Sequence, residues 1–484
     1  MFLASRYRTR WVERRSWIFI HDNAGNGASF RIVQAVTCTA ADCVWITVRS
    51  IMIDRRSFLT IGASATAAAA QTPPPPAAEE AAKPVSPFTD PDFGFTALIA
   101  LGASYYRGGD PGELLAILSH IKAGDFESAW QAYHDAGVES RTMAEQAAAK
   151  RHNVSAREAY LWAAGHFSAA LRFLDGTKDP DRIQACWQEY AAGWSAAGAL
   201  FDPPVERLEI PYEGGGLTGW FLRVDGSRRR RPLVILNTGA DGLETSMYVL
   251  GGAGALARGY NCLILNGPGQ GDSLWVRKLY FRPDWEKVIT PVVDAMLRHR
   301  EVDPKCIALV GVSQGGYWVP RALAFEHRIA AGVADPGVWD VSDPWLRNLP
   351  KFVRDTLDAG KKSQFDQMLQ IGTASNARAK AMLRFRMRPF GMTSYYDAFH
   401  AVREYNLAEV AGRIRCPMLI TDPEGEQFFP GQARKLYDAL QCPKAIVQFT
   451  REQGADQHCE VGAPGYRDYC IYNWLDETLA VTRA

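Results

Sequence analysis

The segment "ALVGVSQGGYWV", Ala308–Val319, decides the fold of this chain. Its first residues are small and β-branched, which predicts a buried β-strand, and large apolar residues after the glycines predict a helix. The motif G-x-S-x-G therefore falls at a strand-to-helix turn, where a sharp bend presents the hydroxyl of Ser313 above the end of a sheet. A glycine turn with an incidental serine is the alternative interpretation.

Strand-like and helix-like segments alternate on both sides of this turn. The apolar segments that predict strands are 205–212, 217–224, 232–237, 261–266, 306–311, 329–335, 416–422 and 444–450. Helices are expected near 247–258, 284–300, 314–326, 430–440 and 465–480. Buried strands that alternate with helices predict an α/β fold, with a mostly parallel sheet that is covered on both faces.

Residue composition and the spacing of apolar side chains divide the chain into further regions. Residues 91–200 have apolar side chains at spacings of three and four, which predicts a helical N-terminal lid domain of four to six helices. The catalytic α/β domain is expected over 201–335 and 403–484. The aromatic-rich insertion 336–402 falls where strands end, the side on which open α/β sheets bind ligands. We expect a helical cap there, although most of its aromatic residues are expected to form its own small core.

The N-terminal region resembles an export signal. Arg55 and Arg56 precede an apolar segment that ends in alanines, which is typical of a twin-arginine signal peptide over 52–70. The pattern predicts export to the periplasm, and a chance arginine pair in a disordered tail is the alternative. Such signals begin near the N-terminus, so residues 1–51 are expected to be a non-native upstream extension. A Pro/Ala linker is expected over 71–90.

Composition narrows the classes of function. The chain has 484 residues, 47% hydrophobic and 22% charged, with a net charge of +1. No apolar run reaches the roughly 18 residues of a membrane span, and apart from its arginine-rich start the chain is mildly acidic, which argues against nucleic acid. We expect a small-molecule substrate, no cofactor and no metal, and a homodimer is left open. The nine cysteines form no CxxC motif, which favours free thiols.

A serine nucleophile needs a base and an acid that orients the base. In folds of this kind the order along the chain is serine, acid, histidine. His458 follows the last predicted strand and is the expected base. Glu426 is the expected acid because of its position before the next proline, and Asp422, nearer the strand end, is the alternative.

Two backbone N–H groups should stabilise the developing oxyanion. One is expected from Gln314, which follows the nucleophile. The other is expected from the loop "TGADG" after a predicted strand, at Ala240 or at Asp241. The loop "NGPGQGDS", 266–273, lacks the spacing of a phosphate-binding loop and is expected to make a tight connection near the pocket.

These motifs, together with "DPEGEQFFPGQ" and "GADQH", resemble the α/β-hydrolase fold over about residues 205–480. The helical N-terminal domain, "GPGQG" and a cap that ends in "FGMTSYYDAF" are similar to the subfamily of dihydroxypseudooxynicotine hydrolase and fungal polyketide-shortening hydrolases. The resemblance implies a Ser/acid/His triad, a site between core and cap, and cleavage of a C–C bond next to a carbonyl. Glu426 stands where that family usually has Asp.

The resemblance also implies an additional acid in the cap, for which Asp340 and Asp343 are candidates, and Tyr395 is a further candidate for the pocket. Three functions follow. The first is a serine hydrolase of small organic esters or ketones. The second is an exopeptidase of acylaminoacyl type, for which the sequence shows no cluster that would capture a peptide terminus. The third is a binding protein on an inactive scaffold, which the intact order of serine, acid and histidine disfavours.

Overall fold

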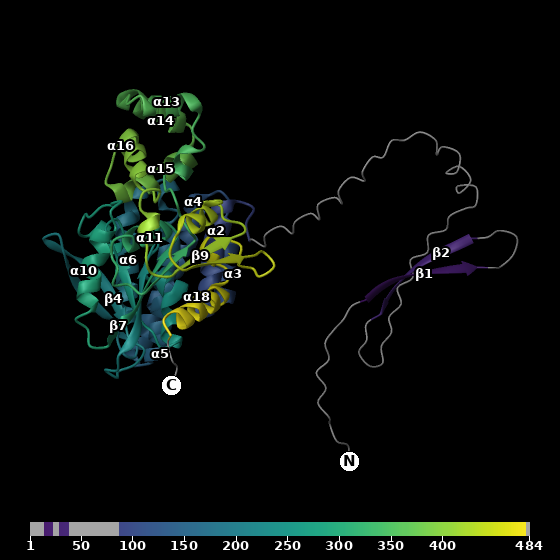
Figure 1. Cartoon of the computed structure of the whole chain (residues 1–484), viewed down its shortest axis with the longest axis horizontal. Helices are drawn as coiled ribbons and strands as arrows, with labels where there is room; N and C mark the ends of the chain where they lie inside the picture. Colours follow the sequence, from purple (N-terminus) through teal and green to yellow (C-terminus); the bar gives the residue numbers. More distant parts are fainter. Residues whose placement is uncertain (1–13, 23–28, 38–86, 481–484) are drawn as a thin grey trace, which may run out of the picture. The chain divides into compact units, whose positions relative to one another are not determined.

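The computed structural model describes residues 14–22, 29–37 and 87–480 (Figure 1). Near the N-terminus, β1 (Arg14–Asp22) pairs with the antiparallel strand β2 (Ser29–Thr37). The predicted signal peptide at 52–70, and the linker as far as residue 86, lie outside the described residues.

The centre of the second unit, residues 84–484, is a single eight-stranded sheet. Its strands are β3 (Glu206–Tyr212), β4 (Gly215–Leu222), β5 (Arg231–Asn237), β6 (Asn261–Asn266), β7 (Val302–Val312), β8 (Ala331–Asp335), β9 (Met418–Pro423) and β10 (Lys444–Phe449). Their spatial order is β10-β9-β8-β7-β5-β6-β4-β3. Only the pairings that involve β4 are antiparallel. The mostly parallel sheet confirms the predicted fold class.

Successive residues of the central strands point to opposite faces of the sheet, as the pleat requires. Leu233 and Ile235 of β5 pack with the helices α10 (Glu286–Met296), α11 (Gly315–Leu323) and α17 (Gln432–Ala439) on one face. Val234 and Leu236 pack on the other face, with α18 (Pro464–Thr478) and the N-terminal helices. Both faces are therefore buried, which explains why these strands read as continuous apolar segments.

The N-terminal helices cover one face of the sheet. They are α2 (Pro91–Ala103), α3 (Pro111–Ser119), α4 (Phe126–Ala149), α5 (Asn153–Leu171) and α6 (Ile183–Ala199). Asp90, Asp110 and Asp125 accept backbone N–H groups at the starts of α2, α3 and α4. Trp194 of α6 packs edge-on against Trp220 of β4, with ring centroids 5.9 Å apart. These helices therefore share a hydrophobic core with the sheet.

The insertion after β8 forms a helical cap. Its helices are α12 (Asp343–Leu346), α13 (Lys351–Asp358), α14 (Lys362–Ala374), α15 (Ala377–Met387) and α16 (Tyr395–Ala401), and Figure 1 shows α13 to α16 grouped at one end of this unit. Phe399 packs against Trp345 and Phe365, with ring centroids 5.2 and 5.4 Å apart. These rings are continuous with the hydrophobic core on the α10 face of the sheet, so the expectation that the cap aromatics form a separate small core is wrong. Among the described residues, no helix is both long enough and apolar enough to cross a bilayer.

One predicted helix, near 247–258, is interrupted. The chain forms α7 (Glu244–Met247), a π-helical turn η4 (Tyr248–Gly252) and α8 (Ala253–Ala257). Gly251 has a φ of 133°, and its carbonyl oxygen accepts the hydroxyl of Tyr472 at 2.7 Å. The predicted helix is therefore correct for α8, whereas its first part forms the turn η4, to which Tyr472 of the distant helix α18 donates.

Candidate active site

Ser313 occupies a sharp turn between β7 and α11. Its φ of 59° lies in the left-handed region, which is strained for a residue with a side chain. The backbone N–H of Ser313 donates to the carbonyl oxygen of Asp335 on the neighbouring strand at 2.6 Å. A Cβ at Gly311 would overlap the carbonyl oxygen of Gly315, so the turn requires glycine there. The local sequence thus fixes the backbone that presents the serine.

His458 joins Ser313 to Glu426. The His458 Nε2 atom lies 2.8 Å from the Ser313 Oγ, and the His458 Nδ1 atom lies 2.7 Å from the Glu426 Oε2. A carboxylate only accepts hydrogen bonds, so the Nδ1 atom carries a proton and the Nε2 atom of the neutral ring is free to accept the serine hydroxyl. The three side chains come from the segments that follow β7, β9 and β10. The structure therefore brings together the three residues that the sequence predicted.

The second carboxylate oxygen of Glu426 is also occupied. Its Oε1 atom accepts the backbone N–H groups of Phe428 and Phe429 at 2.8 and 2.9 Å. Burial raises the pKa of Glu426, but His458 and these two N–H groups together lower it by more, so the net shift is downward. The charged form is therefore favoured, which suits a group that orients a histidine and stabilises its protonated form.

Asp422, the alternative acid, lies on β9 and is paired in the sheet with Gln448 of β10. No hydrogen bond joins Asp422 to His458 within the described part of the chain. Burial raises the pKa of Asp422, Arg434 lowers it and Glu426 raises it, with an upward net shift. The geometry thus places Glu426, and not Asp422, at the histidine.

The loop after β5 lies directly against the nucleophile. A Cβ at Gly239 would come within 2.5 Å of the Ser313 Cβ, so only glycine allows this approach. Gln314, Ala240 and Asp241 line the same cavity as Ser313. Among the described residues, the backbone N–H groups of Gln314 and Ala240 have no hydrogen-bond acceptor. The side chain of Asp241 forms an ion pair with Arg172 of the N-terminal region.

Gln270 holds this loop in place, a role that the sequence analysis missed. Its Nε2 atom donates to the carbonyl oxygens of Thr238 and Gly239 at 2.9 and 3.0 Å. Its Oε1 atom accepts the N–H of Gly267 at 3.0 Å. The only signal in the sequence is one long polar residue between glycines in "GPGQGDS", the loop that was expected near the pocket.

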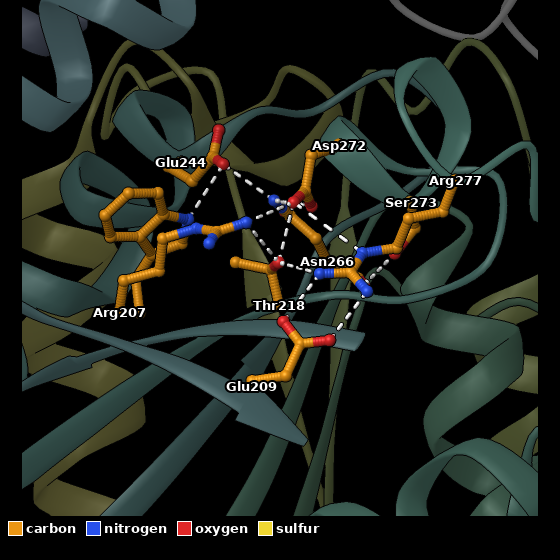
Figure 2. A network of polar contacts seen from close by, with 9 residues as sticks. Arg207, Glu209, Thr218, Glu244, Asn266, Asp272, Ser273 and Arg277 are labelled. Atoms are coloured by element: carbon orange, nitrogen blue, oxygen red, sulfur yellow. Dashed lines mark hydrogen bonds and ion pairs between the residues drawn. The ribbon is translucent and has the colours of Figure 1, made fainter. Parts of the chain in front are cut away.

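A polar network anchors the loop that carries Gln270 to the edge of the sheet (Figure 2). Asp272 accepts the Thr218 hydroxyl of β4 at 2.6 Å and a guanidinium N–H of Arg207 at 2.9 Å. Asn266 donates its amide to the carboxylate of Glu244 at 2.7 Å. Side chains of β3, β4 and α7 therefore fix the loop after β6, and through Gln270 they fix the loop beside Ser313.

Four ionisable side chains are buried behind the turn of Ser313. Arg467 of α18 donates to Asp335 at 2.6 Å and to Asp468 at 3.0 Å, and its Nε atom lies 3.8 Å from Glu460. Three carboxyl groups thus share one guanidinium. Burial, and then Asp335, raise the pKa of Glu460 well above its ordinary range, which favours the protonated form of this carboxyl group.

A cavity of about 180 Å³ opens above Ser313 and His458. It is lined mainly by apolar side chains of α2, of α7 and η4, of the segment before α10, of the cap, and of the loop 424–431 that carries Glu426 (the acid loop). They are Phe95, Ile99, Met247, Leu250, Phe281, Trp345, Phe385, Phe390, Phe428 and Phe429. Two arginines, Arg172 and Arg386, also line it. In the described residues, no group of three or more His, Cys, Asp or Glu side chains could hold a metal ion.

The three pocket candidates from the sequence are not brought to this cavity. Asp340 accepts the N–H and hydroxyl of Ser342 and the amide of Asn406, and so fastens a turn. Asp343 begins α12, with its carboxylate 3.4 Å from Arg347. Tyr395 begins α16 and packs against the hydrophobic core that contains Leu233 and Ile235 of β5. Local hydrogen bonds and packing, which the sequence did not reveal, hold these side chains elsewhere.

Comparison with known proteins places the chain in a family. No protein-family model matches it. "Alpha/beta hydrolase gkaG" from Penicillium citrinum is 31% identical over 377 residues, which cover 71% of this chain and 83% of that protein. "Hydrolase LUC6" from Fusarium sp is 29% identical over 408 residues, which cover 81% of this chain and 97% of that protein. The chain belongs to the α/β-hydrolase family, and its curated relatives identify it as a hydrolase.

A solved structure supports the same fold. The crystal structure of 2,6-dihydroxy-pseudo-oxynicotine hydrolase superimposes with a TM-score of 0.62 at 20% sequence identity. The match covers 78% of this chain and 95% of that protein, so it includes the N-terminal helices as well as the sheet. The predicted resemblance to this subfamily is confirmed.

Proposed function

We propose that the protein is a serine hydrolase of small organic carbonyl compounds, with Ser313 as nucleophile, His458 as general base and Glu426 as the orienting acid. The observation that carries the proposal is the continuous chain of hydrogen bonds from Ser313 through His458 to Glu426 at the floor of an apolar cavity. A serine hydroxyl is a poor nucleophile alone, and such a chain is what activates it.

In the proposed reaction, Ser313 Oγ attacks the carbonyl carbon of the substrate while its proton moves to His458 Nε2. The backbone N–H groups of Gln314 and Ala240 stabilise the oxyanion, because both border the cavity next to Ser313. When the tetrahedral intermediate collapses, His458 returns the proton to the leaving group, which is an alkoxide from an ester or the ketone enolate that is released when a β-diketone is cleaved. Water, activated by His458, then hydrolyses the acyl-enzyme.

Two features support a small organic substrate. The cavity is compact and mostly apolar, and residues of the cap and of α2 line it. A curated relative from Gibberella moniliformis, 29% identical over 413 residues, is named 20-hydroxy-prefusarin hydrolase, and the structural neighbour is named 2,6-dihydroxy-pseudo-oxynicotine hydrolase. Whether the scissile bond is C–O or C–C depends on the leaving group, since both bonds are cleaved through the same acyl-enzyme.

A fluorophosphonate probe tests the proposal directly. We expect covalent labelling of the wild-type protein and none of Ser313→Ala at unchanged melting temperature. Absence of labelling on folded wild-type protein would overturn the proposal. A panel of aryl esters, β-diketones and acylaminoacyl anilides then identifies the bond that is cleaved, and preferential hydrolysis of the anilides would show an exopeptidase instead.

A further inference from the structure

Arg386 stands apart from the other cap arginines because it lines the cavity without a carboxylate partner. It lies on α15 beside Phe385, and both residues border the cavity that contains Ser313. Its Nη1 atom donates to the carbonyl oxygen of Pro344 at 3.2 Å, and its guanidinium lies 5.7 Å from the ring centroid of Trp345. No carboxylate of the described residues lies within 4.0 Å of it.

The neighbouring arginines show the contrast. Arg172, which also lines the cavity, is neutralised by Asp241. Arg388, two residues further along the cap, is paired with Asp175. Arg386 has only one neutral carbonyl as acceptor, so its Nε and Nη2 groups have no protein acceptor within the described residues.

A cation in an apolar cavity favours an anionic ligand. Burial and the neighbouring Arg347 lower the pKa of Arg386, Asp92 raises it, and the net shift is downward. A guanidinium nevertheless stays protonated at any pH at which the enzyme works. Its desolvation is unfavourable unless a negative charge compensates it. The planar group also presents N–H donors in the arrangement that binds two oxygens at once.

We propose that Arg386 selects substrates that carry an anionic oxygen group, such as a carboxylate, on an otherwise apolar body. This inference rests on the proposed serine hydrolase function and names the substrate class of the same site. The aromatic walls accept the body of the substrate, Ser313 attacks its carbonyl, and Arg386 binds its anionic end. The sign of the charge, rather than shape alone, would then decide between substrates of equal size.

Matched ester pairs test the proposal. The anionic set comprises the mono-4-nitrophenyl esters of succinic, glutaric and adipic acids, and the neutral set comprises the same esters with the free carboxylate capped as a methyl ester. For wild type we expect a higher kcat/KM on the anionic member of at least one pair. In Arg386→Gln that preference should fall by about 10- to 100-fold, the usual effect of losing a hydrogen bond between charged groups, with the neutral esters little changed.

Two further variants separate charge from structure. Arg386→Lys keeps the positive charge and should retain part of the preference, although it loses the planar fork. Arg384→Gln removes an exposed cation from the same helix and should behave as wild type. Equal loss on both ester sets in Arg386→Gln, or a wild-type preference for the neutral esters, would overturn the inference while leaving the hydrolase function intact.

Binding measurements without turnover distinguish a failure of anion selection from a failure of the proposed hydrolase reaction. Glutaric acid mono-4-nitroanilide and its methyl ester can be titrated calorimetrically into Ser313→Ala and into the double variant Ser313→Ala/Arg386→Gln. We expect the carboxylate form to bind more tightly to the single variant, and this difference to disappear in the double variant. Equal binding of the two forms to Ser313→Ala would contradict anion selection, whereas failed fluorophosphonate labelling of wild type would contradict only the reaction.

Discussion

The cavity has two sides that are built in different ways: the floor, which carries Ser313, His458 and Glu426, and the roof, which is the helical cap. On the floor, backbone groups fix the reacting side chains. The N–H of Ser313 donates to the backbone carbonyl oxygen of Asp335, and the N–H groups of Phe428 and Phe429 donate to the carboxylate of Glu426. The roof is joined to the N-terminal helices by side-chain ion pairs from Arg378 and Arg388. The difference teaches that the chemistry is set by the sheet, whereas the substrate-facing surface depends on side chains that can change without disturbing the sheet.

The largest effect is expected at the floor, from Glu426→Gln. An amide cannot stabilise protonated His458, and its NH₂ group would face either His458 or the N–H groups of the following phenylalanines. We expect kcat to fall by roughly 10²- to 10⁴-fold, and Asp422→Asn to leave kcat nearly unchanged. Steady-state kinetics of both variants on an aryl ester provide the measurement. A collapse of kcat in Asp422→Asn alone would assign the acid to Asp422.

A smaller effect is expected one layer behind the floor, from Gln270→Met. Methionine fills the same space but cannot donate to the carbonyl oxygens of Thr238 and Gly239. The loop that presents the Ala240 N–H would then be less well positioned, and kcat should fall about 10- to 100-fold, somewhat less than the loss of an oxyanion donor. KM and the melting temperature serve as controls. A change confined to the melting temperature would reduce Gln270 to a structural residue.

At the roof, the two cap ion pairs should differ in their contribution to stability. The Asp175 side chain is only 6% exposed, so Arg388→Gln leaves a buried carboxylate without its partner. We expect the free energy of unfolding to fall by about 1–3 kcal/mol. Arg378→Gln removes a side chain that is 40% exposed and should cost less than about 1 kcal/mol. Urea denaturation compares the two, and equal losses would show that burial does not distinguish them.

The last prediction concerns the pH dependence of stability, in Glu460→Gln beneath the floor. Burial raises the native pKa of Glu460, so above the ordinary carboxyl pKa the native state holds a proton that the unfolded state has lost. The contribution of Glu460 to the free energy of unfolding therefore declines as the pH rises through this window. Glutamine is permanently neutral, so the variant should gain stability relative to wild type between pH 5 and pH 8 in denaturant titrations. A difference that stays constant or shrinks with rising pH would contradict the protonated state of Glu460.

Much of the floor could be predicted from local sequence. The eight strands follow from apolar periodicity, and the position of Ser313 follows from glycines whose substitution would cause a clash within a few residues. His458 follows from its place after the last strand. These features depend on neighbours in the chain, and such neighbours leave a pattern that can be read directly.

The tertiary structure decided what depends on residues distant in sequence. Glu426 and Asp422 are four positions apart, and only the fold of the acid loop onto His458 separates them. The attachment of the cap through Arg388 joins residues 213 positions apart, and Arg386 faces the cavity only because α15 packs above it. The sequence by itself therefore determined the fold, the nucleophile and the base, because strand periodicity and tight turns are local. The pocket that selects the substrate was decided by packing between distant segments, which no local pattern records.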